Sequence, residues 1–370
     1  MFSGYKWSNY HSIAFLFKTF WNLNVTTLKD ISEELGLSVA TVSRALNGFP
    51  EVSEKTRELV EQTAQRMNYR PNRAAQKLVS GRSGMVGMLV PLQPGMSAES
   101  SLVEVIMGLS ARLAERDIDL VMQVILDEDP VAPYRRMISK NTLDGFILNA
   151  PQVNDPRIAF LQQAKVPFVV HGRIDDDPTH AFYDLDNADA AAQAVNLLAD
   201  LGHQRIAFIN GPESAAFANQ RTSGFNAAMR TRMLSVQADF LSYGENTRAS
   251  GYMRALSLLA LPPDARPTAL LCASTTLAHG VLRAAGDRGL SVPKDLSIIC
   301  HDDLVPVLTS DDTNPPLTVT KAALSLACAP LADKLIALLN GASPVEQQTT
   351  ERAELIVRQS TGPAPRSIGA

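Results

Sequence analysis

The chain has 370 residues, of which 45% are hydrophobic and 19% are charged, and its formal net charge is −4 at pH 7. This length exceeds one small domain and is ample for a sizeable core. The short apolar stretch at residues 13–17 is followed by Lys18. A membrane-spanning helix needs about 20 apolar residues and a signal peptide needs a cleavage site, so we expect neither.

The three cysteines, Cys272, Cys300 and Cys328, lie far apart in the sequence. No Cys-x-x-Cys pair or Cys/His spacing typical of a metal site is present, so we expect no metal and no cofactor. Cysteines of this kind are typical of buried, reduced thiols in a cytoplasmic protein.

Residues 1–24 precede the first clear pattern. We interpret them as a disordered arm or an over-extended start. An arm that contacts DNA through Lys6 or Lys18 is the alternative.

The first structured segment is expected to be a pair of short helices. Apolar residues recur at helical spacing in two runs, Leu28, Ile31 and Leu35, then Val42, Ala45 and Leu46. Thr27 and Ser38 are suited to cap the two helices, and Gly36 suits the tight turn between them. Two helices joined so closely predict a helix-turn-helix, whose second helix enters the major groove of DNA.

The outward residues of the second helix separate DNA binding from an ordinary helical hairpin in a core. Thr41, Ser43, Arg44 and Asn47 all hydrogen-bond readily to phosphates and base edges. A third helix is predicted over residues 54–67, with Ser53 as its cap. Residues 25–84 hold nine basic and seven acidic side chains, so a slightly basic head precedes an acidic body. This distribution favours phosphate contact at one end only.

Residues 27–78 resemble the headpiece of the LacI/GalR family of bacterial repressors. The matching runs are 27–31 (TLKDI), 36–47 (GLSVATVSRALN), 52–57 (VSEKTR) and 68–78 (NYRPNRAAQKL). Ser32 departs from the usual alanine, and we expect no consequence. The resemblance implies DNA contacts by Thr27, Ser38, Val39, Ala40, Thr41, Ser43, Arg44, Asn47, Ser53, Thr56, Tyr69, Asn72, Ala75 and Leu78.

The same resemblance divides the chain into an extension (1–24), a helix-turn-helix domain (25–71), a hinge helix with linker (72–83) and an effector-binding and dimerisation domain (84–370). Leu78 matches a leucine of the family that inserts between two base pairs from the minor groove and bends the DNA. The alternative is that Leu78 packs on the effector domain.

From residue 84 the pattern alternates short apolar runs with helical stretches. The apolar runs are 86–90, 120–125, 146–148, 168–170, 206–209, 269–272, 296–299 and 317–319, and the helical stretches include 102–115, 189–199, 220–230 and 276–287. This alternation predicts parallel sheets covered on both faces. Eight strands over almost 300 residues predict two α/β lobes rather than one sheet, with a ligand at the carboxyl ends of the strands.

The resemblance extends to this part of the chain through residues 186–187 (DN), 201–207 (LGHQRIA), 211–212 (GP), 292–299 (VPKDLSII) and 315–319 (PPLTV). It implies a two-lobed α/β effector domain similar to periplasmic sugar-binding proteins. We expect the first lobe at about 84–183 and 317–340, and the second at about 184–314 and 341–360, with a last strand near 353–358.

Six residues are candidates for effector binding. The resemblance implies that Arg221 contacts the effector, and a surface arginine is the alternative. It also implies that Asp302 lies at a strand end and accepts hydrogen bonds from the effector. Cys300-His301 precedes Asp302 where the family usually has glycine and an aromatic residue. Ser274 and Thr275 replace a familiar Asn-Asp pair. His171 and Arg173 follow a strand and open into the cleft unless they form an exposed turn. Tyr183 is a stacking platform for a sugar ring or a core aromatic.

We therefore interpret the chain as a repressor of carbohydrate-utilisation genes. A homodimer would bind a near-palindromic operator in double-stranded DNA, and a small sugar or sugar derivative would control its affinity. Residues 154–157 and 167–173 further resemble α-glucoside regulators of the family. An enzyme is disfavoured because no phosphate-binding loop, nucleophile elbow or zinc-protease motif is present. A sugar-binding module without a regulatory role is the remaining alternative.

Overall fold

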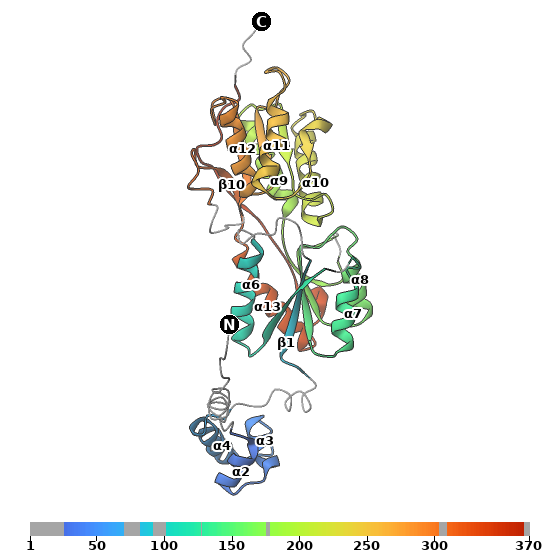
Figure 1. Ribbon diagram of the computed structural model, residues 1–370, viewed down its shortest axis with the longest axis vertical. Coiled ribbons are helices and arrows are strands. Elements are labelled where there is room, and N and C mark those ends of the chain that lie inside the picture. Colours follow the sequence, from blue (N-terminus) through green and yellow to red (C-terminus); the bar gives the residue numbers. More distant parts are fainter. Residues whose placement is uncertain are drawn as a thin grey trace, which may run out of the picture. The chain divides into compact units, whose positions relative to one another are not determined.

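The computed structural model describes residues 26–69, 82–91, 101–126, 128–174, 178–302 and 309–365. The chain forms two compact units, Met1–Gly81 and Arg82–Ala370, coloured from blue to red along the sequence in Figure 1. Each unit is described by itself below. No helix in these described ranges is long and apolar enough to cross a membrane.

The first unit is built from three helices, α2 (Leu28–Leu35), α3 (Val39–Leu46) and α4 (Glu54–Arg66), which confirms the three predicted helices. Thr27, Ser38 and Ser53 cap them, each accepting a hydrogen bond from a backbone N–H three residues on. Gly36 ends α2 with φ +62°, a left-handed conformation that glycine adopts without strain.

A small core joins these helices. Its buried members are Ile31, Val42, Ala45, Val52, Val60 and Ala64. Ser32 is also buried, and its hydroxyl donates to the carbonyl oxygen of Lys29 at 2.8 Å. The departure from alanine at this position is therefore accommodated, because the buried hydroxyl has an acceptor within its own helix.

The second unit contains two six-stranded sheets, and each forms the centre of one lobe. The first sheet has the order β11-β5-β4-β3-β1-β2, and the second has the order β12-β10-β9-β8-β6-β7. The first consists of β1 (Met85–Pro91), β2 (Asp119–Ile125), β3 (Gly145–Asn149), β4 (Phe168–His171), β5 (Ala181–Leu185) and β11 (Gln348–Glu351). All its pairings are parallel.

Helices cover both faces of the first sheet. On one face, α6 (Ser101–Ala114) and α13 (Ser325–Leu339) lie side by side, and on the other are α7 (Ala132–Ser139) and α8 (Pro156–Gln163), as Figure 1 shows. Each face has its own buried apolar cluster, one containing Leu109 and Leu331 and the other Tyr134 and Leu161. Burial on both faces explains why these strands are continuous apolar runs rather than alternating ones.

The second sheet consists of β6 (Ile206–Ile209), β7 (Leu241–Ser242), β8 (Ala269–Cys272), β9 (Ser297–Asp302), β10 (Thr318–Lys321) and β12 (Glu354–Ile356). Only the β10–β12 pair is antiparallel among the described pairings. Its helices are α9 (Asn187–Asp200), α10 (Ala216–Thr231), α11 (Arg248–Leu259) and α12 (Thr275–Asp287). Two 3-10 turns, η1 (Ala238–Phe240) and η2 (Pro344–Glu346), complete the described elements.

Glycines allow the helices of the second lobe to pack with their backbones in contact. A Cβ on Gly224 of α10 would overlap the carbonyl group of Ala188 at the start of α9. Gly251 and Gly280 play the same role where α11 meets α12. Each of these helix pairs therefore packs too closely to admit even a methyl group at the crossing point.

All eight predicted strands are present, and the predicted fold class is confirmed. The sequence analysis missed β5, β7 and β11. Strand β11 has the sequence QTTE with no apolar residue, because it lies at the edge of its sheet. Strand β7 has only two residues.

The predicted lobe boundaries were wrong at two places. Residues 317–340 were assigned to the first lobe, but β10 pairs with β9 in the second sheet, and the chain returns to the first lobe only after Lys321. Residues 341–360 were assigned to the second lobe, but β11 pairs with β5 in the first. The boundary at residue 184 divides β5, which extends to Leu185.

The lobes are joined by three chain crossovers and, besides side-chain contacts, by one further backbone contact among the described residues. The crossovers lie between β5 and α9, between β10 and α13, and between β11 and β12. The further contact is an antiparallel bridge between Gln152, after β3, and Ala215, before α10. There the Val153 N–H donates to Ser214 and the Ala216 N–H donates to Pro151, both at 3.0 Å.

Candidate functional site

The outward face of α3 is the candidate DNA-reading surface. Val39, Ala40, Arg44 and Asn47 are exposed, and the Val39 side chain is 44% exposed although it is apolar. An exposed valine at the start of a short helix contributes nothing to the core, whereas it can contact a thymine methyl group in the major groove. Asn47 donates to the Ser43 carbonyl oxygen at 2.7 Å, which fixes the amide at the end of α3.

The predicted serines and threonines lie at the amino ends of the three helices, except Ser43, which lies in the middle of α3. Ser38 accepts from the Thr41 N–H at 3.1 Å, and the two hydroxyls lie 2.8 Å apart. Ser53 and Thr56 repeat this arrangement at α4. Exposed helix amino ends are suited to DNA phosphates, because their N–H groups and dipole favour an anion.

The amino end of α2 is closed by a capping box. Thr27 accepts from the Asp30 N–H, and the Asp30 carboxylate accepts from the Thr27 N–H at 2.7 Å. The Thr27 N–H, and then the Thr27 hydroxyl, which donates to the same carboxylate at 2.8 Å, lower the pKa of Asp30. Thr27 is exposed.

The remaining predicted DNA contacts differ in how far the structure describes them. Tyr69 is half-buried and packs against the headpiece core, so only part of its ring faces outward. The predicted contacts Asn72, Ala75 and Leu78 lie outside the described residues. The wedge hypothesis for Leu78 stays a prediction.

A cavity of about 1350 Å³ lies between the two sheets of the second unit. It is lined by residues after β3, β4 and β5 of the first lobe and after β8 of the second, together with the first turns of α8 and α10. This is the strand-end position expected for a ligand in parallel α/β sheets. Five of the six predicted effector residues line it, namely His171, Arg173, Tyr183, Arg221 and Ser274.

Arg221 lies on α10 and is 8% exposed. Its Nε donates to Asn187 Oδ1 and its Nη1 donates to the Ala273 carbonyl oxygen, both at 2.8 Å. The guanidinium carbon lies 5.1 Å from the ring centre of Phe217, one turn earlier in α10. Arg221 is thus a fixed cation within the cavity and not a mobile surface residue.

Arg173 and Asp184 form a charged pair beside Arg221. Arg173 Nε donates to Asp184 Oδ2 at 3.1 Å, and Asn187 Nδ2 donates to Asp184 Oδ1 at 3.3 Å. Asp184 is 4% exposed. Burial raises the pKa of Asp184 to about 7, against the lowering influence of Arg173 and Arg221.

Asp155 and Arg157 form a second charged pair at the start of α8. Both are buried, and Arg157 donates from Nε and Nη2 to the Asp155 carboxylate, the latter at 2.5 Å. Burial alone would raise the pKa of Asp155, but the hydrogen bonds and charge of Arg157 lower it below its ordinary value. Tyr134 lies next to this pair, and burial raises its pKa.

The other lining residues provide polar and aromatic surface. His171 Nδ1 lies 2.8 Å from Asn149 Oδ1, and its ring centre is 6.5 Å from that of Tyr183. Burial, followed by the charge of Glu351, raises the pKa of the half-buried Tyr183. Ser274 caps α12 and accepts from the Leu277 N–H at 3.2 Å. Its hydroxyl is therefore engaged in the fold of α12.

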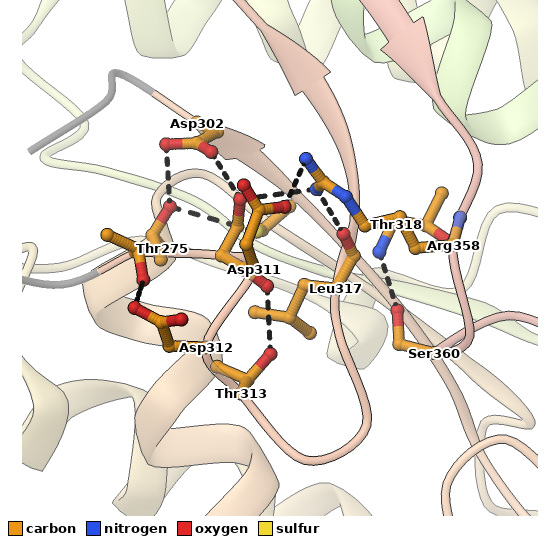
Figure 2. A network of polar contacts seen from close by, with 12 residues as sticks. Thr275, Asp302, Asp311, Asp312, Thr313, Leu317, Thr318, Arg358 and Ser360 are labelled. Carbon is orange, nitrogen blue, oxygen red and sulfur yellow. Dashed lines mark hydrogen bonds and ion pairs between the residues drawn. The ribbon is translucent and has the colours of Figure 1, made fainter.

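Asp302 has a different environment from the one expected. Among the described residues that line the cavity it is missing, although its neighbour His301 is present. Asp302 is 1% exposed and accepts hydrogen bonds from Ser310 and Thr275. Figure 2 shows it in a polar network that continues through Ser310 to Arg358, which also contacts Asp311 and the Leu317 carbonyl oxygen at 2.5 Å and 2.6 Å.

Sequence reasoning therefore missed several residues that line the cavity, among them Arg157 and two carboxylates. Asp155, Arg157, Asp184, Asn187 and Phe217 were not among its candidates. The one available signal was the 154–157 segment, where a charged pair brackets a proline at the start of a helix. Asp184 gave no signal, because it lies in a strand that the apolar pattern did not reveal.

The described residues contain no group of three or more His, Cys, Asp or Glu side chains that could hold a metal ion. The three cysteines are free and buried, as predicted, and burial raises the pKa of each thiol. Burial therefore favours the uncharged form of all three thiols.

A helix-turn-helix unit followed by a two-lobed ligand-binding domain defines a class of protein, the ligand-responsive DNA-binding regulators. Comparison with known families agrees. Residues 27–72 match "Bacterial regulatory proteins, lacI family" and residues 195–361 match "Periplasmic binding protein-like domain".

Whole-chain relatives show the same relationship. The HTH-type transcriptional regulator AglR of Rhizobium meliloti (strain 1021) is 40% identical over 339 residues, which cover 91% of this chain and 95% of AglR. The lac repressor dimer bound to operator and the anti-inducer ONPF superposes with a TM-score of 0.75 at 26% identity, covering 91% of this chain and 99% of that one. The CelR–cellobiose complex gives 0.67 at 27% identity, covering 90% and 99%. The chain belongs to the LacI family of bacterial regulatory proteins, and it is a DNA-binding transcriptional regulator.

Proposed function

We propose that this regulator represses carbohydrate-utilisation genes and that a sugar bound in the cavity controls its affinity for operator DNA. The observation that carries this proposal is the combination, in one chain, of an exposed recognition helix with a cavity in which Arg221 is fixed by Asn187 and Ala273. A sugar-binding module without a regulatory role would not need the recognition helix. A DNA-binding protein that responds to no ligand would not need the cavity.

The chemistry of the cavity supports a sugar. Its charged residues are paired with one another, as in Arg173–Asp184 and Arg157–Asp155, so the lining offers hydrogen bonds without a large excess of one charge. Phe217 and Tyr183 provide aromatic surface for the apolar face of a sugar ring. The CelR structure holds cellobiose. The volume of about 1350 Å³ exceeds the usual 300–1,000 Å³ of a small-molecule site and has room for more than one sugar unit.

Control of DNA binding requires that the sugar prefer one arrangement of the lobes. The cavity is lined by both lobes, so closure around a sugar would alter the three crossovers that join them. The sugar then shifts operator affinity by as much as its affinities for the two arrangements differ. An α-glucoside is the effector we favour, because residues 154–157 and 167–173 resemble regulators of that subgroup.

A homodimer is the second part of the proposal. Exposed apolar side chains gather on the first lobe, on β2, which is an edge strand, and on α6 and the start of α13. They are Val103, Met107, Met122, Val124, Leu126 and Leu326. Exposed apolar surface of this kind is typical of an interface. The lac repressor in the operator complex is a dimer. We further propose that the protein acts in the cytoplasm and is not an enzyme.

The test combines operator binding with a sugar panel. An operator is selected from random-sequence DNA by the purified full chain, and fluorescence anisotropy then measures its affinity with and without maltose, trehalose, sucrose, cellobiose and raffinose. We expect at least one sugar to raise the melting temperature and to change operator affinity, because a ligand that binds only the folded state stabilises it.

The variant pair Arg221→Ala and Arg230→Ala separates the cavity from the rest of α10. Arg230 is exposed on the same helix and serves as the matched control. Arg221→Ala should retain operator binding and lose the sugar response, while Arg230→Ala should behave as the wild type. A full response of Arg221→Ala at the wild-type sugar concentration would remove Arg221 from the effector contacts.

A further inference from the structure

Asp184 occupies a position that none of the predicted sites accounts for. It lies near the end of β5, where the chain is about to leave the first lobe, and its carboxylate is among the residues that line the cavity. Its hydrogen-bond donors come from both lobes. Arg173 follows β4 in the first lobe, and Asn187 begins α9 in the second.

The same contacts connect Asp184 to the arginine that we assign to the effector. Asn187, which donates to Asp184, accepts from Arg221 Nε at 2.8 Å. Gln220, the neighbour of Arg221, accepts from Asn187 at 3.1 Å and donates to the Arg173 carbonyl oxygen at 3.1 Å. Asp184 is therefore part of a polar network that holds α10 to the end of β4 across the crossover between the lobes.

In this network the Asp184 carboxylate is a buried hydrogen-bond acceptor at the cavity, and the Arg221 guanidinium is a fixed donor at the same cavity. A sugar hydroxyl can donate to a carboxylate while its oxygen accepts from a guanidinium, so a carboxylate and an arginine together bind vicinal hydroxyls well. The sequence analysis expected Asp302 to be this acceptor. Asp302 instead accepts from Ser310 and Thr275 and does not line the described part of the cavity.

We propose that Asp184 is a carboxylate that accepts hydrogen bonds from the hydroxyls of the sugar effector, in the same part of the cavity as the guanidinium of Arg221. This inference rests on the proposed function. Because Asp184 touches groups of both lobes, the sugar bound to it also strengthens the contacts at the crossover between β5 and α9.

The assignment has a measurable consequence for pH. Burial raises the pKa of Asp184 to about 7. Only the ionised carboxylate is a full hydrogen-bond acceptor, so sugar affinity should approach its maximum at about pH 8 and should fall as the pH falls through 7. If the sugar binds only the ionised form, the Kd at pH 6 should be about tenfold higher than at pH 8.

Other ionisable groups surround Asp184 and must be separated from it. The guanidinium groups of Arg173 and Arg221 are the cations that act on its carboxyl. On the neighbouring strands, His171 pairs with Tyr183 in register, and Glu351 pairs with Leu185. His171 is the group whose ordinary pKa also lies near this range, so His171→Gln is needed as a comparison.

The experiment measures the Kd by calorimetry at pH 6 and pH 8, using the sugar of the panel above that gives the largest rise in melting temperature. The proteins are the wild type, Asp184→Asn, His171→Gln and Asp186→Asn. Asp186 caps α9, does not line the described part of the cavity, and is the matched control. Operator binding without sugar shows that each variant is folded.

We expect Asp184→Asn to weaken sugar binding at pH 8 by roughly 10- to 100-fold, the loss typical of a hydrogen bond to a charged group, and to abolish the pH dependence. The other two variants should retain the pH dependence. If Asp184→Asn fails to fold, the wild-type pH profile still decides. Equal wild-type affinity at pH 6 and pH 8, or an Asp184→Asn variant within twofold of the wild type, overturns the inference and leaves the proposed function standing. Failure of every sugar to bind the wild type overturns both.

Discussion

The headpiece and the effector domain expose their functional side chains to opposite degrees. In the headpiece, the candidate contacts Val39 and Arg44 are exposed, and Val39 retains 44% of its accessible surface. In the effector domain, Arg221 and Asp184 are 8% and 4% exposed. The difference follows from the size of each ligand. DNA is larger than the headpiece and is contacted at the protein surface, whereas a sugar is small enough to be enclosed in a cavity.

Burial then determines what each region requires of its own residues. An exposed arginine is solvated and needs no partner within the fold. A buried one needs hydrogen-bond acceptors among its neighbours, as Arg157 has in the Asp155 carboxylate and Arg221 in the side-chain oxygen of Asn187. Substitution of a buried, charged residue of the effector domain should therefore reduce stability, whereas substitution of the exposed Arg44 in the headpiece should not. The four predictions below test this contrast.

The largest effect is expected for Arg157→Ala. It leaves the Asp155 carboxylate buried without its cation, which costs about 3–5 kcal/mol in the free energy of unfolding. Urea denaturation followed by circular dichroism measures it. Arg232→Ala is the control, since its pair with Asp200 lies at the surface and should contribute only about 0–1 kcal/mol. Equal losses in the free energy of unfolding for the two variants would show that burial does not determine the cost of breaking an ion pair in this protein.

Ile31→Ala should destabilise the headpiece by about 2–5 kcal/mol, as expected for a fully buried isoleucine. Six buried residues form that core, so such a loss should unfold the headpiece and abolish operator binding. The sugar-induced rise in melting temperature of the effector domain should remain. Leu59→Ala, at an exposed position of α4, is the control, and loss of both activities in Ile31→Ala would mean that the two units do not unfold independently.

Arg44→Ala should cost about 1–3 kcal/mol in operator binding and less on random DNA, because a guanidinium can donate twice to one guanine. The melting temperature should not change, since Arg44 is exposed. Anisotropy titrations on both DNAs measure the effect. Equal losses on the two DNAs would make Arg44 a phosphate contact.

The smallest effect is expected for Ser38→Ala, at about 1 kcal/mol of headpiece stability, because the N-terminus of α3 loses its cap. Ser32→Ala is the matched control in the preceding helix. The Ser32 hydroxyl bonds only to the Lys29 carbonyl oxygen among the described contacts, so its removal should be nearly neutral. A larger loss for Ser32→Ala than for Ser38→Ala would contradict this assignment of the cap.

The contrast also explains which parts could be predicted from sequence. The three headpiece helices and their caps depend on residues within a few positions of each other, and Thr27, Gly36 and Ser38 were identified from spacing alone. The eight buried strands were predicted because burial on both faces gives continuous apolar runs.

The cavity depends instead on contacts between distant residues. Asp184 and Arg173 are 11 positions apart, and Arg221 and Ala273 are 52 apart. No local pattern distinguishes a carboxylate in the cavity from one turned into the fold, which is why Asp302 was chosen and Asp184 was not. The edge strand β11 was missed for a related reason, because partial exposure removed its apolar signal.

The backbone bridge between the lobes gives a direct measure of how often the cavity opens. The amides of Val153 and Ala216 each donate across the gap, to Ser214 and Pro151. A motion that separates the lobes at this point must break both bonds together, and it then exposes both amides to solvent. Their exchange with deuterium should therefore proceed at a common rate, and a bound sugar should slow both by the same factor. The exchange rates of these two amides, which lie on opposite lobes, therefore report how often the cavity opens, and they can be measured without DNA.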